Sequence, residues 1–275
     1  METGLEGKTV LLSGASGGIG SEIAKLFDKE GARLVLTYLP DERGKQEIKE
    51  LELSLKSEFI IVPADLTKEE EVENIFIEAD KKFGRIDALV ACAGVWSETK
   101  YIADRTLGEW NRAFQLNSTA DFMLARGFFR NLRKYPGEHG SIVFIGSTAG
   151  VIGESQHHDY AATKAAIIFG LAQTLRVEIV SFAKRGRVNV VNPGWTATPV
   201  TYDMLKDKQF VHTITSTIPL RKVATPFDIA SAVVFLSSDL LAGHITGEVL
   251  TVAGGLKDRL YHGELKPVKE DLKPY

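Results

Sequence analysis

The sequence predicts an α/β protein in which one doubly wound domain is built on a seven-stranded parallel sheet. Short runs rich in Val, Ile and Leu alternate with longer stretches of helical period. These runs are apolar almost throughout, as expected for strands that are buried on both faces. Neither an internal repeat nor a Pro- or Ser-rich linker interrupts the 275 residues. A single domain is therefore expected.

Seven strands are expected, in order along the chain. They span residues 8–14, 32–38, 58–64, 87–93, 140–147, 187–193 and 247–253. Helices between consecutive parallel strands make right-handed crossovers, which place helices on both faces of the sheet.

Capping residues predict where several helices begin and end. Thr67 and Thr106 each precede a Glu by three residues, which is the capping-box pattern. Thr225 precedes Pro226 and an acid in the first turn, which also indicates a helix start. Gly31 follows a helical stretch and is expected in a left-handed C-cap conformation.

One long segment departs from the alternation of strands and helices. Residues 195–219 follow the end of a strand, where ligands bind in sheets of this kind, and are interpreted as a lid or substrate loop. The catalytic domain is expected to span 1–255. A polar C-terminal tail, 256–275, follows and could fray or pack on a neighbouring subunit.

Composition argues against several classes of partner. The formal net charge is −3 and no basic run stands out, so nucleic-acid binding is not expected. No apolar run approaches the ~20 residues that span a bilayer. The single cysteine, Cys92, excludes an intrachain disulfide and fits a reducing compartment. The N-terminus lacks the pattern of a signal peptide, so a cytoplasmic protein is expected.

A glycine-rich turn follows the first expected strand and precedes a helical pattern. Gly14, Gly18 and Gly20 are spaced G-x-x-x-G-x-G. Such glycines allow a tight turn, close approach of the backbone to a pyrophosphate, and close packing of helix on strand. The N–H groups and the positive helix end would face the phosphates. A purely structural turn is the alternative, but the place between strand and helix favours dinucleotide binding.

The end of the second strand bears on the choice of cofactor. NAD specificity normally needs an acid there to bind the ribose 2′-OH. Residues 38–43 read YLPDER, with no acid at the first position past the strand. Arg43 or Lys45 could reach a 2′-phosphate, so NADP is favoured over NAD. Asp41 could instead bend back to the ribose, which would reverse this preference.

Tyr160 and Lys164 are four residues apart and lie on one face of an expected helix. A free phenol is a poor acid or base at neutral pH because its pKa is ~10. A neighbouring ammonium group favours phenolate, so the pair can exchange a proton with a carbonyl or alcohol oxygen. Ser147, at a strand's carboxyl end, could hydrogen-bond the same oxygen. Taken alone, the pattern of Tyr160 and Lys164 would favour an ordinary surface pair.

With YAATK (160–164) added to the glycine turn, the chain resembles the short-chain dehydrogenase/reductase family from about residue 5 to 255. Several motifs match in order. Asp65-Leu66 resembles the family's adenine-contacting acid, and Asn117 in FQLNSTA occupies the place of its helix-kinking Asn. Ser147 lies thirteen residues before Tyr160, which is the family spacing. NPGWTAT (192–198) resembles the nicotinamide-side P-G-x-x-x-T.

The resemblance implies a Rossmann-type fold and a catalytic set of Ser147, Tyr160, Lys164 and Asn117. Ser147 would position the substrate oxygen and Tyr160 would transfer the proton. Lys164 would also hold the nicotinamide ribose, and the helix backbone at Asn117 would hold a water that links Lys164 to solvent. The expected cofactor-binding residues are Gly14, Ser16, Gly18, Ile19, Gly20, Tyr38, Asp65, Leu66, Ala93, Gly94, Tyr160, Lys164, Pro193, Gly194, Thr196 and Thr198.

One motif departs from the family pattern. Residues 91–94 read ACAG where the family commonly has N-N-A-G. Gly94 still lets the backbone pass close to a cofactor, but the polar side chains that brace the central sheet are lost. Cys92 is expected to be a small core residue and not a reactive thiol.

The remaining polar residues before Tyr160 are weaker candidates. Adjacent His157 and His158 have no third ligand at a usual spacing, and H-E-x-x-H is absent, so no metal is expected. Ser147 has no nucleophile-elbow context. Asp159 is expected to cap the helix that carries Tyr160. Candidate substrate contacts are Glu154, His157 and Trp195.

The sequence thus predicts an NAD(P)-dependent oxidoreductase that moves a hydride between nicotinamide and a secondary alcohol or ketone. A hydroxylated or small polar carbonyl substrate of sugar or polyol type is favoured. A 3-oxoacyl thioester is the alternative substrate, and an NAD(P)-binding sensor or scaffold without turnover is a more distant one. By resemblance, the protein is expected to be a homotetramer.

Overall fold

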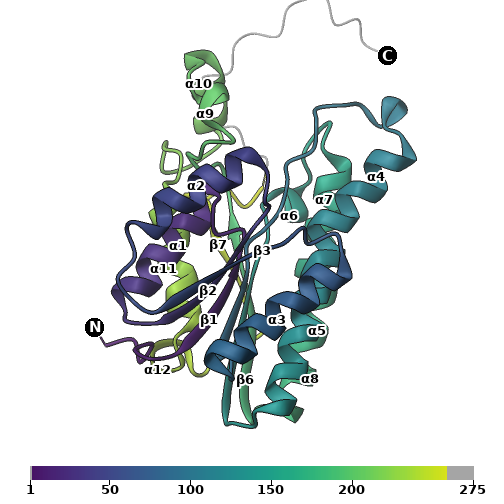
Figure 1. Ribbon diagram of the computed structural model, residues 1–275. Coiled ribbons are helices and arrows are strands. Elements are labelled where there is room, and N and C mark those ends of the chain that lie inside the picture. The colour runs from purple at the N-terminus through teal and green to yellow at the C-terminus, as the bar shows by residue number, and fades with distance from the viewer. Residues whose placement is uncertain (1, 259–275) are drawn as a thin grey trace, which may run out of the picture.

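Seven parallel strands form one sheet in the order β3-β2-β1-β4-β5-β6-β7 in the computed structural model, which describes residues 2–258 (Figure 1). All seven expected strands and their parallel pairing are confirmed. The strands are β1 (Thr9–Ser13), β2 (Arg33–Tyr38), β3 (Phe59–Pro63), β4 (Ala88–Ala91), β5 (His139–Ile145), β6 (Arg185–Pro193) and β7 (Val249–Val252). The strand order reverses between β1 and β4, and in such sheets a ligand crevice opens at the carboxyl ends there.

Helices cover both faces of the sheet (Figure 1). One face carries α1 (Gly18–Lys29), α2 (Glu42–Glu52) and α11 (Pro226–Ser237), and the other carries α3 (Glu69–Phe83), α5 (Ala120–Lys134) and α8 (Ala172–Glu178). Side chains alternate along each strand, so Leu11 joins the core on one face while Val10 and Leu12 join the core on the other. The remaining α-helices are α4 (Leu107–Phe114), α6 (Ala149–Ile152), α7 (His158–Ala165), α9 (Tyr202–Leu205), α10 (Lys208–Ser216) and α12 (Asp239–Ala242).

Two long helical segments are each interrupted by a π-helical stretch. Residues Gln115–Thr119 join α4 to α5, and Ala166–Leu171 join α7 to α8. Short 3₁₀ turns also occur at Ile102–Asp104 and Ile179–Ser181. The first π stretch contains Asn117, and π segments of this kind are often found at functional sites.

Three of the four predicted helix boundaries are confirmed. Thr106 and Thr225 both form reciprocal capping boxes, and Gly31 adopts a left-handed φ of 74°. The prediction for Thr67 is wrong. Helix α3 begins at Glu69 with Lys68 as its N-cap, and the Thr67 hydroxyl instead donates to Asp65 Oδ1 at 2.8 Å. The nearer carboxylate outcompetes the helix N–H groups for this side chain.

The expected substrate loop, 195–219, contains the two short helices α9 and α10. Its base is tied by two backbone bonds, from Ala197 N–H to Ala224 O (2.8 Å) and from Ala224 N–H to Trp195 O (2.9 Å). Within the predicted tail, Leu256 is buried, and residues 259–275 lie outside the described residues. No helix in the described part of the chain is long and apolar enough to cross a membrane.

Candidate active site

A cavity of about 580 Å³ opens at the carboxyl edge of the sheet. The glycine turn, the ends of β2 to β6, α7 and the segment before α9 all contribute to its lining. Every predicted cofactor residue lines it, together with Ser147, Glu154 and Trp195. Asn117 and His157 are the two predicted site residues that do not line it. The topology therefore brings most of the predicted site to one place.

Three glycines of the turn have no room for a side chain. Gly14 has a φ of 68°, and a Cβ there would lie 2.8 Å from the Cα of Ala93. A Cβ on Gly18 would lie 2.7 Å from the ring of Pro199, and one on Gly20 would collide with the carbonyl oxygen of Gly14. The backbone is thus bare where helix α1 begins, and this fits a cradle for a dinucleotide pyrophosphate.

The unusual ACAG segment after β4 is braced from β1. The Ser13 hydroxyl oxygen accepts the backbone N–H groups of Cys92 (3.0 Å) and Ala93 (3.1 Å). Cys92 is only partly buried, because it lines the cavity while it packs against the apolar core on one face of the sheet. Burial raises the pKa of its thiol to about 12, so the thiol stays protonated at neutral pH. The Ser13 hydroxyl thus supplies hydrogen bonds to this segment, which lacks the Asn side chains common in the family.

Asn117 lies behind this segment and is fully buried. Its side chain accepts the N–H of Val95 (2.8 Å) and donates to the carbonyl of Val95 (3.1 Å). Its Oδ1 also lies only 3.0 Å from the place a Cβ on Gly94 would take. The side chain of Asn117 therefore fixes the backbone at 94–95, which borders the cavity.

Tyr160, Lys164 and Ser147 all line the cavity. Tyr160 and Lys164 lie one turn apart on α7, with the Lys164 ammonium 5.8 Å from the centre of the Tyr160 ring. Lys164 is buried and donates to the carbonyl of Ile145 at 2.8 Å. Ser147 follows β5, and its hydroxyl accepts the N–H of Ala149 at 3.2 Å. Tyr160 and Lys164 thus share one helix, and Ser147 lies in the short segment between β5 and α6.

Aromatic rings form one wall of the cavity beside Tyr160. The Trp96 ring lies edge-on to Tyr160, with centroids 4.7 Å apart, and 6.2 Å from Trp195. Trp195 in turn contacts Phe210 of α10 at 5.2 Å. Sequence reasoning missed Trp96. The available signal was its position two residues after Gly94, in the loop that follows a central strand.

The structure does not support the roles expected of His157 and Asp159. The His157 ring is buried against Trp96, with centroids 4.1 Å apart, and burial lowers its pKa, which favours the neutral ring. The prediction that Asp159 caps α7 is wrong, because the helix begins at His158 and Asp159 lies within its first turn. There the Asp159 carboxylate accepts the N–H of Tyr160 at 2.9 Å.

The end of the cavity that is lined by residues at the ends of β2 and β3 holds the groups that bear on the cofactor. Arg43 and Tyr38 both line it, and Arg43 pairs with Glu47 at 2.8 Å. The Asp41 carboxylate accepts the N–H of Gly44 at 2.7 Å and caps α2. Burial alone would raise the pKa of Asp65, but hydrogen bonds from Thr67 hold it below its ordinary value. Asp65 is therefore an ionised acceptor at this end.

A parallel sheet of this order, a bare glycine turn at its carboxyl edge and a Tyr–Lys pair in the same cavity are typical of nicotinamide-dependent oxidoreductases. Among the described residues, no group of three or more His, Cys, Asp or Glu side chains could hold a metal ion.

Comparison with known proteins agrees with this class. Residues 14–257 match a family model described as enoyl-(acyl carrier protein) reductase. The 3-oxoacyl-[acyl-carrier-protein] reductase FabG of Rickettsia felis is 35% identical over 92% of this chain and 98% of its own length. The 3beta-hydroxysteroid dehydrogenase 1 of Eggerthella lenta is also 35% identical, over 94% of this chain and 96% of its own.

Similar solved structures agree with this class of protein. A short-chain dehydrogenase/reductase from Brucella melitensis, described as a glucose/ribitol dehydrogenase, superposes with a TM-score of 0.83 at 32% identity over 93% of this chain and 99% of that one. A putative NAD(P)-dependent gluconate 5-dehydrogenase from Beutenbergia cavernae, with bound NADP, has a TM-score of 0.83 at 30% identity, with the same coverage. The chain belongs to the short-chain dehydrogenase/reductase family and is an oxidoreductase of hydroxyl or keto groups with an NAD(P) cofactor.

Proposed function

We propose that this enzyme interconverts a secondary alcohol and a ketone with NADP(H), using Tyr160 as its general acid/base. The observation that carries the proposal is that Ser147, Tyr160 and Lys164 line the same cavity as the bare glycine turn. The cofactor's reactive end and a substrate oxygen can therefore be held within one cavity.

The nicotinamide supplies the hydride chemistry, and the residues of this chain supply position and a proton. The Tyr160 hydroxyl gives a proton to the ketone oxygen or takes one from the alcohol. The Ser147 hydroxyl donates a hydrogen bond to the same oxygen and fixes its place. The buried Lys164 ammonium, one helical turn from Tyr160, would hold the nicotinamide ribose. Asn117 keeps the backbone at 94–95 in place beside them.

The test of this mechanism is Tyr160→Phe. Removing one hydroxyl leaves the ring and its contact with Trp96 in place, so the variant should fold and bind NADPH like the wild type. Because the proton donor is lost, turnover should fall by about 100-fold or more. Nicotinamide absorbance follows turnover, and quenching of tryptophan fluorescence follows NADPH binding. Turnover near the wild-type rate in Tyr160→Phe would overturn the mechanism.

We infer that NADP is preferred over NAD. Asp41 is engaged as the cap of α2, so it is not oriented as a free acceptor for a ribose 2′-OH. Arg43 lines the cavity and is more than half exposed, which leaves its guanidinium accessible to a 2′-phosphate. Lys45 pairs with Glu42 and does not line the cavity, so Arg43 is the better candidate of the two.

For the substrate, we propose a compact hydroxylated carbonyl of sugar or polyol type. The faces of Trp96 and Trp195 would pack on a ring, and Ser147, Thr148 and Thr201 would offer hydroxyls at the same cavity. The sugar-related descriptions of the Brucella and Beutenbergia structures support this substrate class. A panel of sugars, polyols and cyclic ketones, assayed with both cofactors in both directions, tests it.

A 3-oxoacyl thioester is the second candidate. The 35% identity with FabG of Rickettsia felis over nearly the whole of both chains favours it. Turnover of acyl thioesters with none on sugars or polyols would select this candidate over the first. A sensor or scaffold that binds NAD(P) without turnover is a third reading, and inactivity across the whole panel with intact cofactor binding would favour it.

We also propose a homotetramer in the cytoplasm. Apolar side chains are exposed along the outer helices α5, α8 and the π stretch between α7 and α8, including Phe122, Phe169 and Val177. The single cysteine fits a reducing compartment. Light scattering after gel filtration tests the assembly, and cell fractionation tests the location.

A further inference from the structure

A buried ion pair links the substrate side of the cavity to the helix that carries Tyr160. Arg105 Nε lies 3.5 Å from Asp159 Oδ2, and their side chains are only 4% and 1% exposed. Arg105 ends the segment that follows β4 (residues 92–106, here the β4–α4 loop), whereas Asp159 directly precedes Tyr160 in α7. Neither residue lines the cavity.

The Asp159 carboxylate collects contacts from both segments. Its Oδ1 accepts the backbone N–H of Tyr160 at 2.9 Å and the hydroxyl of Ser97 at 2.7 Å. Its Oδ2 faces Arg105. One buried carboxylate therefore connects the proton-donor residue to two points on the β4–α4 loop, one of which lies next to Trp96 in the sequence.

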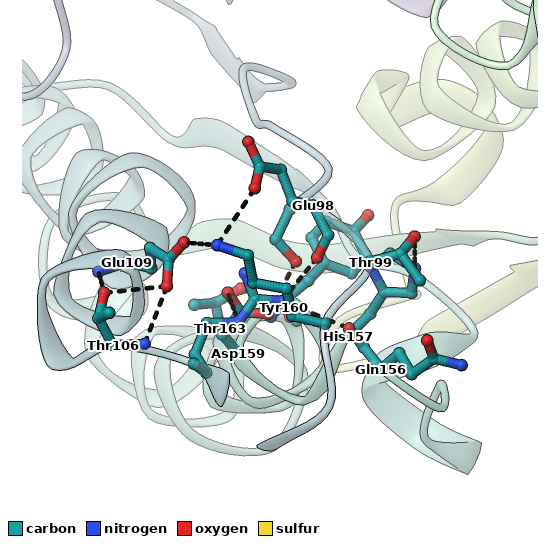
Figure 2. Close-up of polar contacts among 12 residues, drawn as sticks. Glu98, Thr99, Thr106, Glu109, Gln156, His157, Asp159, Tyr160 and Thr163 are labelled. Carbon is teal, nitrogen blue, oxygen red and sulfur yellow. Dashed lines mark hydrogen bonds and ion pairs between the residues drawn. The ribbon is translucent and has the colours of Figure 1, made fainter. Parts of the chain in front are cut away.

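The two segments are joined at further points around this pair. The Arg105 guanidinium donates to the carbonyls of Glu98 (2.6 Å) and Gln156 (3.3 Å). The Gln156 carbonyl also accepts the N–H of Lys100 at 3.1 Å. Gln156 has a φ of 66°, an uncommon conformation for a residue other than glycine, Asn or Asp. Figure 2 shows Gln156, His157 and Asp159 on one side of this network, with Glu98 and Thr99 on the other.

The middle of the loop is anchored on α4. Lys100 bonds to Glu109, which also closes the capping box with Thr106 (Figure 2). The hydrogen bond from Lys100, with those from Thr106, lowers the pKa of Glu109 to about 2. The loop is thus fixed to α4 by Lys100 and to α7 by Arg105 and Ser97.

The position of Trp96 depends on this arrangement. Its ring lies between His157 and Tyr160, at 4.1 and 4.7 Å between centroids, and His157 Nε2 lies 3.3 Å from the Thr99 hydroxyl. If the loop moved away from α7, Trp96 would leave its place beside the Tyr160 ring.

We propose that Arg105 and Asp159 are positioning residues that hold the Trp96 wall and the Tyr160 proton donor in one fixed relation, so that a bound substrate meets both. Neither residue touches the substrate in this proposal. Both act through Trp96 and Tyr160, and the proposal rests on the proposed function of Tyr160.

The test uses Asp159→Asn, which keeps the oxygen that accepts from Ser97 and Tyr160 but removes the charge that faces Arg105. A buried guanidinium is left unpaired, so the β4–α4 loop should shift. We expect kcat/KM for the substrate to fall at least about 10-fold, since small displacements of reacting groups are costly. The dissociation constant for NADPH should stay within about twofold, because the glycine turn is not part of this network and the backbone at 93–95 is held separately by Ser13 and Asn117.

Three companion variants separate positioning from general damage. Arg105→Met should lower kcat/KM similarly, and the Arg105→Met/Asp159→Asn double variant should lose no more than the worse single variant, because no unpaired charge remains. Asp80→Asn removes a more exposed ion pair between α3 and α5 and should leave kcat/KM unchanged. If Asp159→Asn does not fold, Ser97→Ala removes one loop contact only and should still lower kcat/KM several-fold.

A readout that needs no substrate completes the test. Amide hydrogen exchange in residues 95–106 should be faster in Asp159→Asn than in the wild type, with exchange in 14–30 unchanged. The proposal would be overturned by unchanged exchange and kcat/KM in Asp159→Asn. It would also be overturned by a loss of NADPH affinity that matches the loss of kcat/KM, or by fully additive effects of the two single variants. Turnover by Tyr160→Phe, measured in parallel, would instead overturn the proposed function, so the two failures are distinguishable.

Discussion

Asp121 is an ionisable residue with no evident place in the mechanism. Its carboxylate is buried at the start of α5, four residues after Asn117, and neither oxygen has a hydrogen-bond partner among the described residues. Burial raises its pKa to about 7, although the positive charge of Lys164 opposes this. At neutral pH the carboxyl group is therefore near its midpoint, close to the buried lysine of the site.

This pKa predicts how stability depends on pH. An exposed Asp titrates near ~3.9, so the unfolded chain loses this proton well before the folded chain does. The contribution of Asp121 to stability is therefore full below about pH 4, declines as the pH rises to about 7, and is constant above that. The total decline is of the order of 4 kcal/mol, since each pKa unit corresponds to about 1.4 kcal/mol.

Asp121→Asn isolates this effect because the amide does not titrate. The free energy of unfolding of the wild type should fall relative to that of the variant between about pH 4 and 7. Urea unfolding at several pH values measures the difference. Curves that run parallel over this range would contradict the raised pKa.

At the level of elements, where a helix begins depends on whether its capping side chain has a competing hydrogen-bond partner. Thr106 and Thr225 both cap, and within residues 2–258 each hydroxyl also donates to the reciprocal acid of the same box. Thr67 has the same local pattern, yet its hydroxyl goes to Asp65, which lines the cavity. The Thr67 hydroxyl is thus bound to a residue of the cavity lining and does not cap α3.

Thr225→Ala should destabilise the protein by about 1 kcal/mol, the usual cost of losing an N-cap. The loss affects α11, which packs on α1 over the core of one face. The matched control is Thr174→Ala, an exposed threonine within α8 whose hydroxyl bonds only to the carbonyl of Gly170. That control should change stability by less than about 0.5 kcal/mol. Equal effects of the two changes in urea unfolding would contradict the cap assignment.

For the whole molecule, cofactor binding and stability are linked. A ligand that binds only the folded chain adds about 2.7 kcal/mol at 100 times its dissociation constant. If Arg43 binds the 2′-phosphate, NADPH should raise the melting temperature more than NADH at equal concentration. Arg43→Ala should remove this difference by reducing only the NADPH effect, and Lys45→Ala should preserve it. An equal rise with both cofactors in the wild type would contradict the NADP preference.

The strands and most helix boundaries could be predicted because their signals are local. A buried parallel strand such as Val10–Leu12 must be apolar on both faces, and a capping box such as Thr106–Glu109 is complete within four residues. The glycine turn and the Ser147, Tyr160 and Lys164 set could also be located, because each follows a strand or shares a helix face. The contacts of Asp159 could not be predicted from local signals, since its partners Ser97 and Arg105 come from a segment more than 50 positions away.

The sequence by itself determined the fold class, the family and the residues gathered at the carboxyl edge of the sheet. Only the tertiary structure decided that Trp96 forms a wall beside Tyr160, that His157 packs against it, and that Asp121 is buried with no hydrogen-bond partner in the described part of the chain. The reason is physical. Hydrophobic period and capping act over a few residues, whereas burial and ion pairing depend on which distant segments the finished sheet places together.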